Sequence, residues 1–310
     1  MTATALRAPS LILDRQNSIF PLNLDPEVPK IRDLFHLATQ KQWDPATDID
    51  WDAFDAGQYT EKQRYAARQY WSRRAWSEYG AISESPALQL RFCSDPCPPD
   101  LRLFFTIRSQ EESRHAEVCY RMAEMLGGYI EAPSQEAFQG SVATHGVRKM
   151  ALDPNTSVEA TLAALVCAAE EIAFDVFRHL VQITRDPVAR QVCTMIMRDE
   201  VRHCAFGWRY LDYRIPQMNA EEIQRVEDAV ITMMEKVELN GYHSAWLAPK
   251  NPASDMEVEI DRITWEAGLG ATTEELEKPV FVASVQRIRR QMQAWGVNLP
   301  EFHHPKIGAF

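Results

Sequence analysis

The chain has 310 residues, of which 45% are hydrophobic and 25% charged, and its formal net charge is −11 at pH 7. This composition is that of a folded protein with a large core, and the acidic balance argues against nucleic acid or an anionic membrane as a partner. No apolar run approaches the ~20 residues of a membrane span, and the N-terminus lacks the apolar core of a signal peptide. The six cysteines are not spaced like a disulfide framework, so we expect a reduced, cytoplasmic protein.

Helical periodicity predicts an all-α fold, because no stretch alternates convincingly as a strand would. After an irregular arm over 1–25, the expected helices in chain order cover 26–41, 60–85, 98–127, 132–151, 156–184, 187–214, 219–246, 256–266 and 272–295. Four of these are long, which is the layout of a four-helix bundle with accessory helices. We therefore divide the chain into an N-terminal arm and short helix (1–55), the bundle (56–215) and a helical extension packed on it (216–310).

Two copies of one pattern, acid-Glu-x-Arg-His, lie in the second and fourth long helices. Each copy contains Glu-x-x-His: Glu112 with His115, and Glu200 with His203. Residues three apart lie on one face of a helix, so each motif offers a carboxylate and an imidazole to the same point. A dinuclear metal site in a four-helix bundle takes such a pair from two helices and one Glu from each of the other two. The repeat therefore predicts a two-metal carboxylate site.

The first long helix offers Glu61, Glu78 and Glu84 as its carboxylate. Glu78 is the preferred candidate, because it lies on a stripe that is otherwise apolar and includes Ala67, Trp71, Ala75 and Ile82. Glu84, beside Ser83, Ser85 and Pro86, is interpreted as a residue at the end of the helix.

The third long helix offers two adjacent acids, Glu170 and Glu171. Glu170 lies on an apolar face, where a lone acid is costly unless it binds a cation. Glu171 lies on a polar stripe with Asp175, Arg178 and Gln182, a pattern typical of a solvated face. Glu170 is the preferred ligand, and Glu171 remains the alternative.

The acids and arginines within the two repeats predict a hydrogen-bonded layer around the site. Imidazoles that bind a metal usually donate their other N–H to a carboxylate. Glu111 and Asp199 are placed to accept these bonds across the bundle, and Arg114 and Arg202 are placed to hold the two acids in salt bridges.

The ligand set favours particular metals. Four carboxylates and two imidazoles with no thiolate favour iron or manganese over zinc or copper. We expect two iron ions, or an Mn/Fe pair, with O2 as the co-substrate. Since the sequence has no nucleotide-binding or iron–sulfur motif, the electrons should come from a separate ferredoxin or reductase. We also expect a homodimer, because large bundles with long helix faces commonly pair.

The segment Asp199-Glu200-Val201-Arg202-His203 resembles the Asp-Glu-x-Arg-His signature of the ferritin-like diiron-carboxylate oxidases and oxygenases. The segment that begins at Glu170 is also similar to the third-helix segment of these proteins. The resemblance covers about 60–215 and implies a ferritin-like bundle. It implies that the metal ligands, which would also be the catalytic residues, are Glu78, Glu112, His115, Glu170, Glu200 and His203.

Two positions distinguish branches of this superfamily. The ribonucleotide reductase small subunit has a radical tyrosine four residues after its first ligating His, where this chain has Cys119, as in hydroxylases of the methane-oxidising kind. The third His of the arylamine N-oxygenases is replaced by Ile196. The resemblance implies an O2-dependent oxygenase that hydroxylates or N-oxygenates a small organic substrate. The alternatives are a ferritin-like protein that handles metal or oxidises Fe(II), and a desaturase or radical-generating oxidase subunit.

Overall fold

The computed structural model describes residues 28, 30–94, 98–131, 150–151, 153 and 155–310. Within these residues the all-α fold class is confirmed, and the exceptions are two antiparallel strands of two residues each, β1 (His303–His304) and β2 (Gly308–Ala309). The predicted arm and the predicted helix over 132–151 lie almost wholly outside the described residues. The short first helix is present as α1 (Ile31–Gln40).

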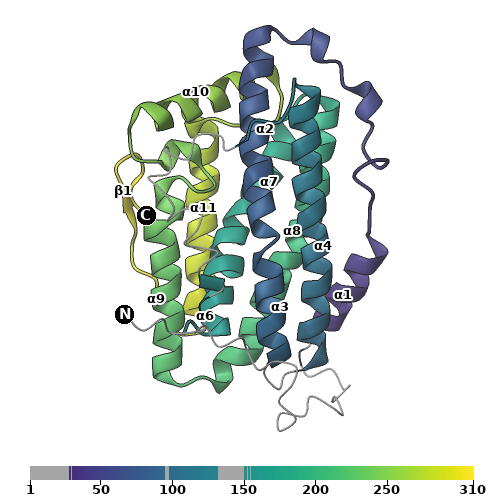
Figure 1. The fold of residues 1–310 in the computed structure, drawn as a ribbon. Helices are drawn as coiled ribbons and strands as arrows, with labels where there is room; N and C mark the ends of the chain where they lie inside the picture. The colour runs from purple at the N-terminus through teal and green to yellow at the C-terminus, as the bar shows by residue number, and fades with distance from the viewer. Residues whose placement is uncertain (1–27, 29, 95–97, 132–149, 152, 154) are drawn as a thin grey trace, which may run out of the picture.

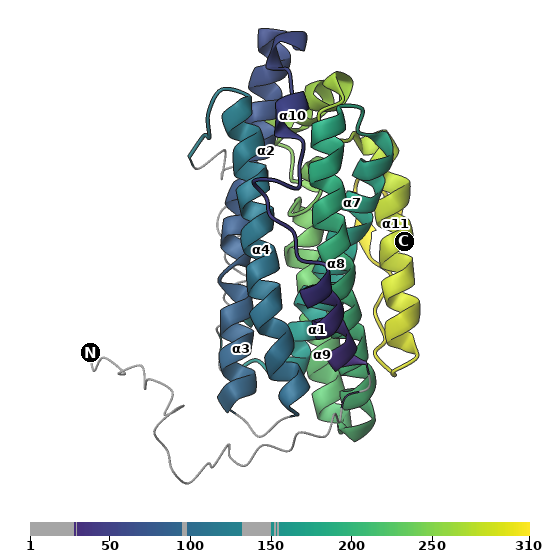
Figure 2. The same ribbon diagram turned by 90° about the vertical axis from the view of Figure 1, so that its right-hand side faces the viewer.

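Four long helical segments stand side by side and form the bundle (Figure 1, Figure 2). Two of them, α4 (Pro99–Met125) and α8 (Pro187–Arg214), match the predicted bounds closely. The first is α2 (Glu61–Ala81), and the third runs without a break through α6 (Val158–Leu162), the π-helix η5 (Ala163–Glu170) and α7 (Glu171–Ile183). Contacts join α2 to α4, α4 to α8, and α7 to α8, so the four segments enclose one interior.

Side-chain caps begin the bundle helices where the sequence places them. Thr60 accepts a hydrogen bond from the Gln63 backbone, and the Gln63 side chain accepts one from the Thr60 backbone, which completes a capping box. Ser157 and Asp186 cap the third and fourth segments by accepting a hydrogen bond from the backbone three residues on, and Pro187 follows in the first helical position, where its missing N–H costs no helical bond. These caps fix the register in which each helix presents its face to the interior.

The predicted helix over 60–85 is interrupted in the structure. Helix α2 ends at Ala81, and a separate helix, α3 (Glu84–Ser94), begins three residues later. Pro86 was expected to end a helix, but it stands in the first turn of α3, which a proline tolerates. Glu84 consequently opens a helix, and its side chain is buried.

The C-terminal extension consists of α9 (Ala220–Lys236), the short turns η7 (Glu238–Asn240) and η8 (Ala245–Leu247), α10 (Pro252–Ala267) and α11 (Glu274–Gln293). The predicted helix over 219–246 is therefore shorter than expected, and Gly241, at φ 95°, turns the chain after η7. Helix α9 contacts η5, α10 contacts α2, and α11 contacts α7. The extension therefore covers the outer side of the third bundle segment.

This packing contradicts one sequence-based interpretation. The polar stripe through Glu171 and Asp175 was expected to face solvent, but both side chains are buried, with 8% and 2% of their surface exposed. Arg287 of α11 lies 2.7 Å from Glu171 and 2.5 Å from Asp175. The periodicity of a single helix cannot reveal a cation that arrives from a segment more than a hundred residues away.

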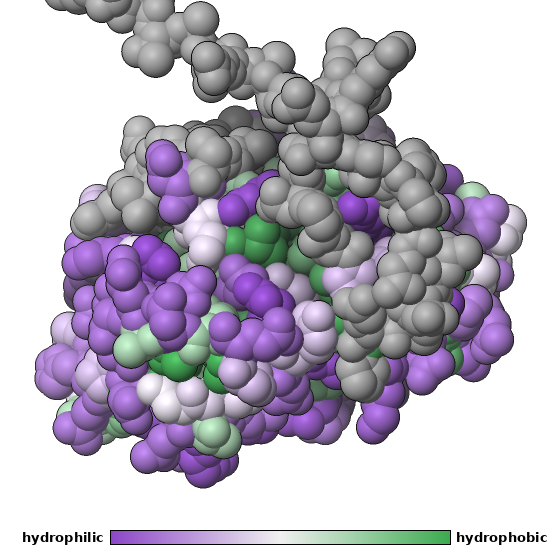
Figure 3. All heavy atoms as spheres, turned by 90° about the horizontal axis from the view of Figure 1, so that it is seen from below, coloured by the Kyte–Doolittle hydropathy of each residue, from purple (hydrophilic) through white to green (hydrophobic). Residues whose placement is uncertain are grey.

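Hydrophilic side chains cover most of the described surface at the lower end of the bundle (Figure 3). Among the described residues, no helix combines the length and the hydropathy needed to cross a membrane. The described cysteines are all free thiols.

Candidate metal centre

Six predicted side chains meet in the interior of the bundle. Five of them form two groups, and within each group the ligand atoms lie within 4.8 Å of one another. One group is Glu78, Glu112 and His115, and the other is Glu112, Glu170 and His203, so Glu112 belongs to both. Glu200 lies between the two imidazoles, with a carboxylate oxygen 3.3 Å from Nδ1 of each. The arrangement has two adjacent positions for a cation, with Glu112 and Glu200 placed between them.

The histidines show whether this cluster suits metal ions. Nδ1 of His115 lies 3.6 Å from Glu112, and Nδ1 of His203 lies 3.4 Å from the same carboxylate. Neither Nδ1 atom, nor Oε2 of Glu170, has a hydrogen-bond partner among the described residues, although all are buried. Buried polar atoms are rarely left unsatisfied, and these converge on one space. Two divalent cations there would satisfy them, so the residues fit a two-metal site.

The π-helix places the third carboxylate. Glu170 is the last residue of η5, and Glu171 is the first of α7. Glu170 joins the cluster, whereas Glu171 accepts hydrogen bonds from Trp208, at 2.9 Å, and from Arg287 on the far side of the helix. A π-turn inserts an extra residue and changes which side chain faces the interior, a feature common at functional sites. The geometry therefore separates two acids that the sequence left as alternatives.

A second layer of charged groups orients the imidazoles. Nε2 of His203 shares a hydrogen bond with Glu111 at 2.8 Å, and Nε2 of His115 lies 3.3 Å from Asp199, so both contacts cross between α4 and α8. Arg202 lies between the two acids and contacts both, 2.5 Å from Glu111. Arg114 lies 3.4 Å from Asp199. With Nε2 held outward in this way, Nδ1 of each ring points inward.

Trp43 extends this layer and was not predicted as part of it. Its indole N–H donates to Asp199 at 2.9 Å, and Arg114 stacks on its ring at 5.3 Å. Trp43 follows α1, which packs against α4 and α8, so a segment outside the bundle completes the site. No helical spacing links Trp43 to Asp199, and the sequence offered only an isolated tryptophan in a polar loop.

The protonation of the cluster follows from its burial and charge. Burial alone lowers the pKa of His203, but the carboxylates of Glu200, Glu111 and Glu112 outweigh it and raise the pKa to about 9. Burial raises the pKa of Glu78 to about 7. Asp199 has a lowered pKa, because the nearby His115, the hydrogen bond from Trp43 and the charge of Arg202 outweigh the effect of burial. Without metal, protons on the imidazoles balance the carboxylates, so metal binding should release protons.

Two arginines near the cluster were also missed. Arg74 and Arg108 each stand four residues before a cluster carboxylate, Glu78 and Glu112, on the same helix face. The Arg108 guanidinium lies 3.0 Å from Glu112 and also contacts Glu170 and Ser85. The spacing was visible in the sequence, but an Arg–Glu pair at this separation usually lies on a solvated helix surface.

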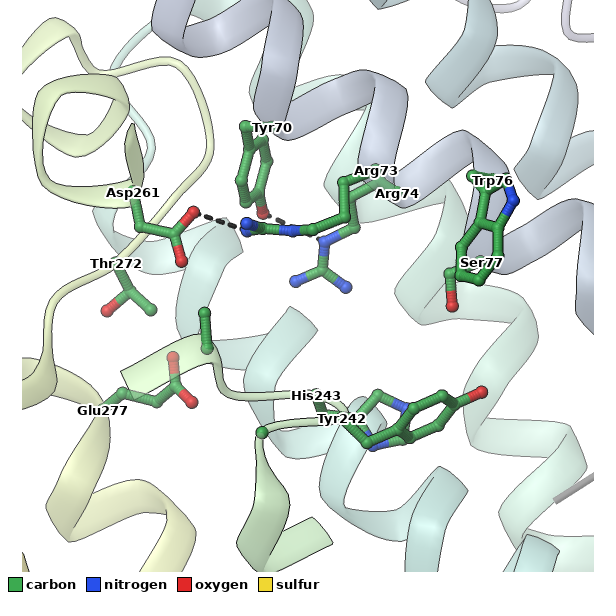
Figure 4. A pocket seen from close by; sticks show the side chains of 12 residues that line it. Tyr70, Arg73, Arg74, Trp76, Ser77, Tyr242, His243, Asp261, Thr272 and Glu277 are labelled. Atoms are coloured by element: carbon green, nitrogen blue, oxygen red, sulfur yellow. Dashed lines mark hydrogen bonds and ion pairs between the residues drawn. The ribbon is translucent and has the colours of Figure 1, made fainter. Parts of the chain in front are cut away.

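A cavity of about 70 Å³ borders the cluster. Its wall includes all four cluster carboxylates together with Arg74, Arg108 and Phe177. Glu84, which we interpreted from the sequence as a residue at a helix end, also lines this cavity. A second cavity, of about 60 Å³, shares Arg74, Ser77, Tyr242 and His243 with the first (Figure 4). Tyr242 and His243 come from the segment between η7 and η8, so the C-terminal extension supplies part of the approach to the cluster.

Glu277 of α11 lines the second cavity and is buried, with hydrogen bonds from Ser244 and from Trp246, the latter at 3.1 Å. Burial raises its pKa to about 7. The folded state therefore holds a proton that the unfolded chain releases, so stability falls as pH rises from the unfolded pKa through about 7. A glutamine at this position does not ionise, so Glu277→Gln should not lose stability over this pH range, and it keeps an oxygen that accepts hydrogen bonds.

The expected result is that Glu277→Gln unfolds like the parent protein near pH 4.5 and is more stable by about 3 kcal/mol above pH 8. Urea unfolding of both proteins at several pH values measures the difference. A stability difference that stays constant across this range would contradict the buried, protonated state of Glu277.

Comparisons with known proteins bear on the fold. No protein-family model and no curated protein matches the sequence. The chain is similar to the solved structure of an R2-like ligand-binding oxidase with an aerobically reconstituted metal cofactor after photoconversion. The TM-score is 0.64, and the two sequences are 16% identical over 86% of this chain and 94% of the other. A variant of R2-like ligand-binding oxidase with an anaerobically reconstituted Mn/Fe cofactor has a TM-score of 0.56 and 16% identity over 89% and 95% of the two chains. The chain therefore has the ferritin-like fold of the R2-like ligand-binding oxidases, and its interior carries carboxylate and histidine groups suited to two metal ions.

Proposed function

We propose that the protein is an O2-dependent dimetal oxygenase that hydroxylates or N-oxygenates a small organic substrate. The observation that carries the proposal is the set of inward-facing, unpartnered Nδ1 atoms of His115 and His203 among four carboxylates, two buried and two partly buried, beside a cavity. The fold shared with proteins that carry an Mn/Fe cofactor supports either two irons or an Mn/Fe pair.

Each candidate ligand has a role that follows from its place. Glu78 and His115 would hold one metal, Glu170 and His203 the other, and Glu112 and Glu200 would lie between them. The bound metals would supply electrons to O2. Glu111 and Asp199 lie against the imidazole Nε2 atoms, and Arg202 contacts both acids, so the ligands stay oriented before a metal arrives.

The reaction balances with an external electron donor. One oxygen atom of O2 enters the product, and two electrons and two protons reduce the other to water. A ferredoxin or reductase would provide these electrons, as the absence of a nucleotide-binding motif from the sequence suggests. Arg74 and Arg108 in the cavity wall disfavour the alternative of an Fe(II)-storing protein, because their positive charge opposes the passage of metal cations.

The direct test is anaerobic loading with Fe(II), alone or with Mn(II), followed by exposure to O2 and a screen of organic substrates with isotopically labelled O2. The proposal expects O2 consumption that depends on metal, and label in the product. Metal-dependent O2 consumption with no labelled product from any substrate would favour the Fe(II)-oxidising alternative instead.

Glu170 and Glu171 provide a matched pair of variants. Glu170→Ala should reduce the bound metal from two ions to one per chain, because Glu170 belongs to only one of the two groups. Glu171→Ala should keep both ions, because its carboxylate faces Trp208 and Arg287. Metal analysis of the two variants decides the point, and loss of an ion from Glu171→Ala alone would reverse the assignment.

A further inference from the structure

The Arg74 side chain marks a second functional element in the cavity system. It lies where the two cavities meet, and it lines both of them. Arg73, its neighbour, is paired with Glu257 and, at 2.6 Å, with Asp261. Arg74 has no carboxylate within ion-pair distance among the residues that the structure describes, and its one hydrogen bond there goes from Nε to the Tyr70 hydroxyl at 3.1 Å. A largely buried guanidinium with no anionic partner suggests that a partner comes from outside the chain.

Two aromatic rings hold this guanidinium in place. Its central carbon lies 4.6 Å from the centre of the Phe177 ring and 5.4 Å from that of Tyr70. Tyr70 is itself anchored, since its hydroxyl donates to the Gly270 carbonyl at 2.6 Å. Because Nε is engaged with Tyr70, the two terminal nitrogens remain, and Figure 4 shows them directed away from Tyr70 into the cavity. Arginine presents such a pair in the fork geometry that matches a carboxylate.

The surrounding acids leave room for an anion. Asp261 is paired with Arg73, which it shares with Glu257, and Glu78 would be engaged by bound metal. Glu277, across the second cavity, receives hydrogen bonds from Ser244 and Trp246. Burial raises the pKa of Glu277 to about 7, so much of it is uncharged near neutral pH. Among the described residues that line the second cavity, Arg74 is therefore an arginine that forms no ion pair, whereas Arg73 pairs with two acids.

The position of Arg74 also sets the size of a ligand. Arg74 precedes Glu78 by four residues on α2, so the two Cα atoms are about 6 Å apart along the helix axis. Because both residues line the inner cavity, a group held at Arg74 would lie close to the cluster, which favours a small substrate. We infer that Arg74 binds the carboxylate of a small organic acid and directs the rest of that substrate through the inner cavity towards the metal pair. This inference rests on the proposed function and specifies its substrate class.

Fluorine NMR of the metal-loaded protein tests the inference with defined probes. The anionic probes are fluoroacetate and para-fluorobenzoate, the neutral matches are fluoroacetamide and para-fluorobenzamide, and the cationic probe is para-fluorobenzylamine. Each probe is titrated into the parent protein, Arg74→Gln, Arg74→Lys and Arg225→Gln. Arg225 is exposed on α9 and pairs with Glu221, so it controls for the loss of one positive charge far from the cavity.

The expected result is that at least one carboxylate binds the parent protein more tightly than its amide. Its Kd should rise by about 10- to 100-fold in Arg74→Gln, as for loss of a charge-assisted hydrogen bond, and less in Arg74→Lys. Arg225→Gln should bind like the parent. Equal binding of carboxylate and amide, preference for the amine, an unchanged Kd in Arg74→Gln, or no binding of either carboxylate would overturn the inference.

Metal analysis of the same samples separates this inference from the proposed function. The parent protein and Arg74→Gln should both hold two ions per chain, because Arg74 belongs to neither ligand group. If the protein cannot hold two metals but still binds carboxylates through Arg74, the proposed function is wrong and the inferred binding site stands. Two bound metals with no preference for carboxylates would overturn the binding site alone.

Discussion

Glu112→Ala protein should lose both metal ions and, with them, metal-dependent O2 consumption. Glu112 is the residue common to both ligand groups, and its carboxylate lies within 3.6 Å of Nδ1 of each histidine. Its removal also takes away the carboxylate that Arg108 contacts at 3.0 Å, leaving a buried positive charge beside the metal positions. We expect O2 consumption to fall by at least about 100-fold, because loss of an outer-layer partner alone weakens metal sites by about 10- to 100-fold.

The matched control is Glu117→Ala on the same helix. Glu117 is 40% exposed and pairs with Arg121 at 2.7 Å, far from the interior. Metal analysis and oxygen-electrode measurements on both variants provide the comparison. Two ions per chain and unchanged O2 consumption in Glu112→Ala would contradict the assignment of Glu112 as a shared ligand.

Arg202→Met should produce the largest loss of stability of any single change around the cluster. Arg202 is buried and contacts both Glu111 and Asp199, and these acids are themselves almost fully buried. After the substitution Arg114 remains near them, at 3.8 Å from Glu111 and 3.4 Å from Asp199, with the imidazoles of His203 and His115. Removing one partner from a buried ionic network costs about 3–5 kcal/mol, because the remaining charges stay desolvated.

Arg209→Met, on the same helix, is the control for this change. Arg209 donates to the backbone of Lys30 near the surface, so its loss should change the free energy of unfolding by about 0.5 kcal/mol or less. Urea unfolding of the metal-free proteins measures both variants without a contribution from bound metal. Equal stabilities for the two variants would show that Arg202 does not hold the acids in place.

The sequence predicted the parts of the site that depend on spacing within one helix. Glu112 with His115 and Glu200 with His203 could be recognised because helical geometry places residues three apart on one face. The apolar surroundings of Glu170 distinguished it from Glu171, and the structure brings Glu170 into the cluster. The fold class followed from the same periodicity.

The remaining features depend on contacts between segments far apart in the chain. Trp43 meets Asp199 only because α1 packs on the bundle, and Arg287 covers Glu171 only because α11 does. Tyr242 lines the cavities from a turn that was predicted to be helical. Whether the guanidinium of Arg74 forms an ion pair depends on its surroundings in three dimensions, and no spacing in the sequence expresses that.

We propose that the interior of the bundle holds two metal ions between α2, α4, η5 and α8. The decisive measurement is quantitative metal analysis of the full-length protein after anaerobic loading with Fe(II) and Mn(II) and removal of excess metal. We expect two ions per chain. A protein that retains one ion or none, while remaining folded, would contradict it.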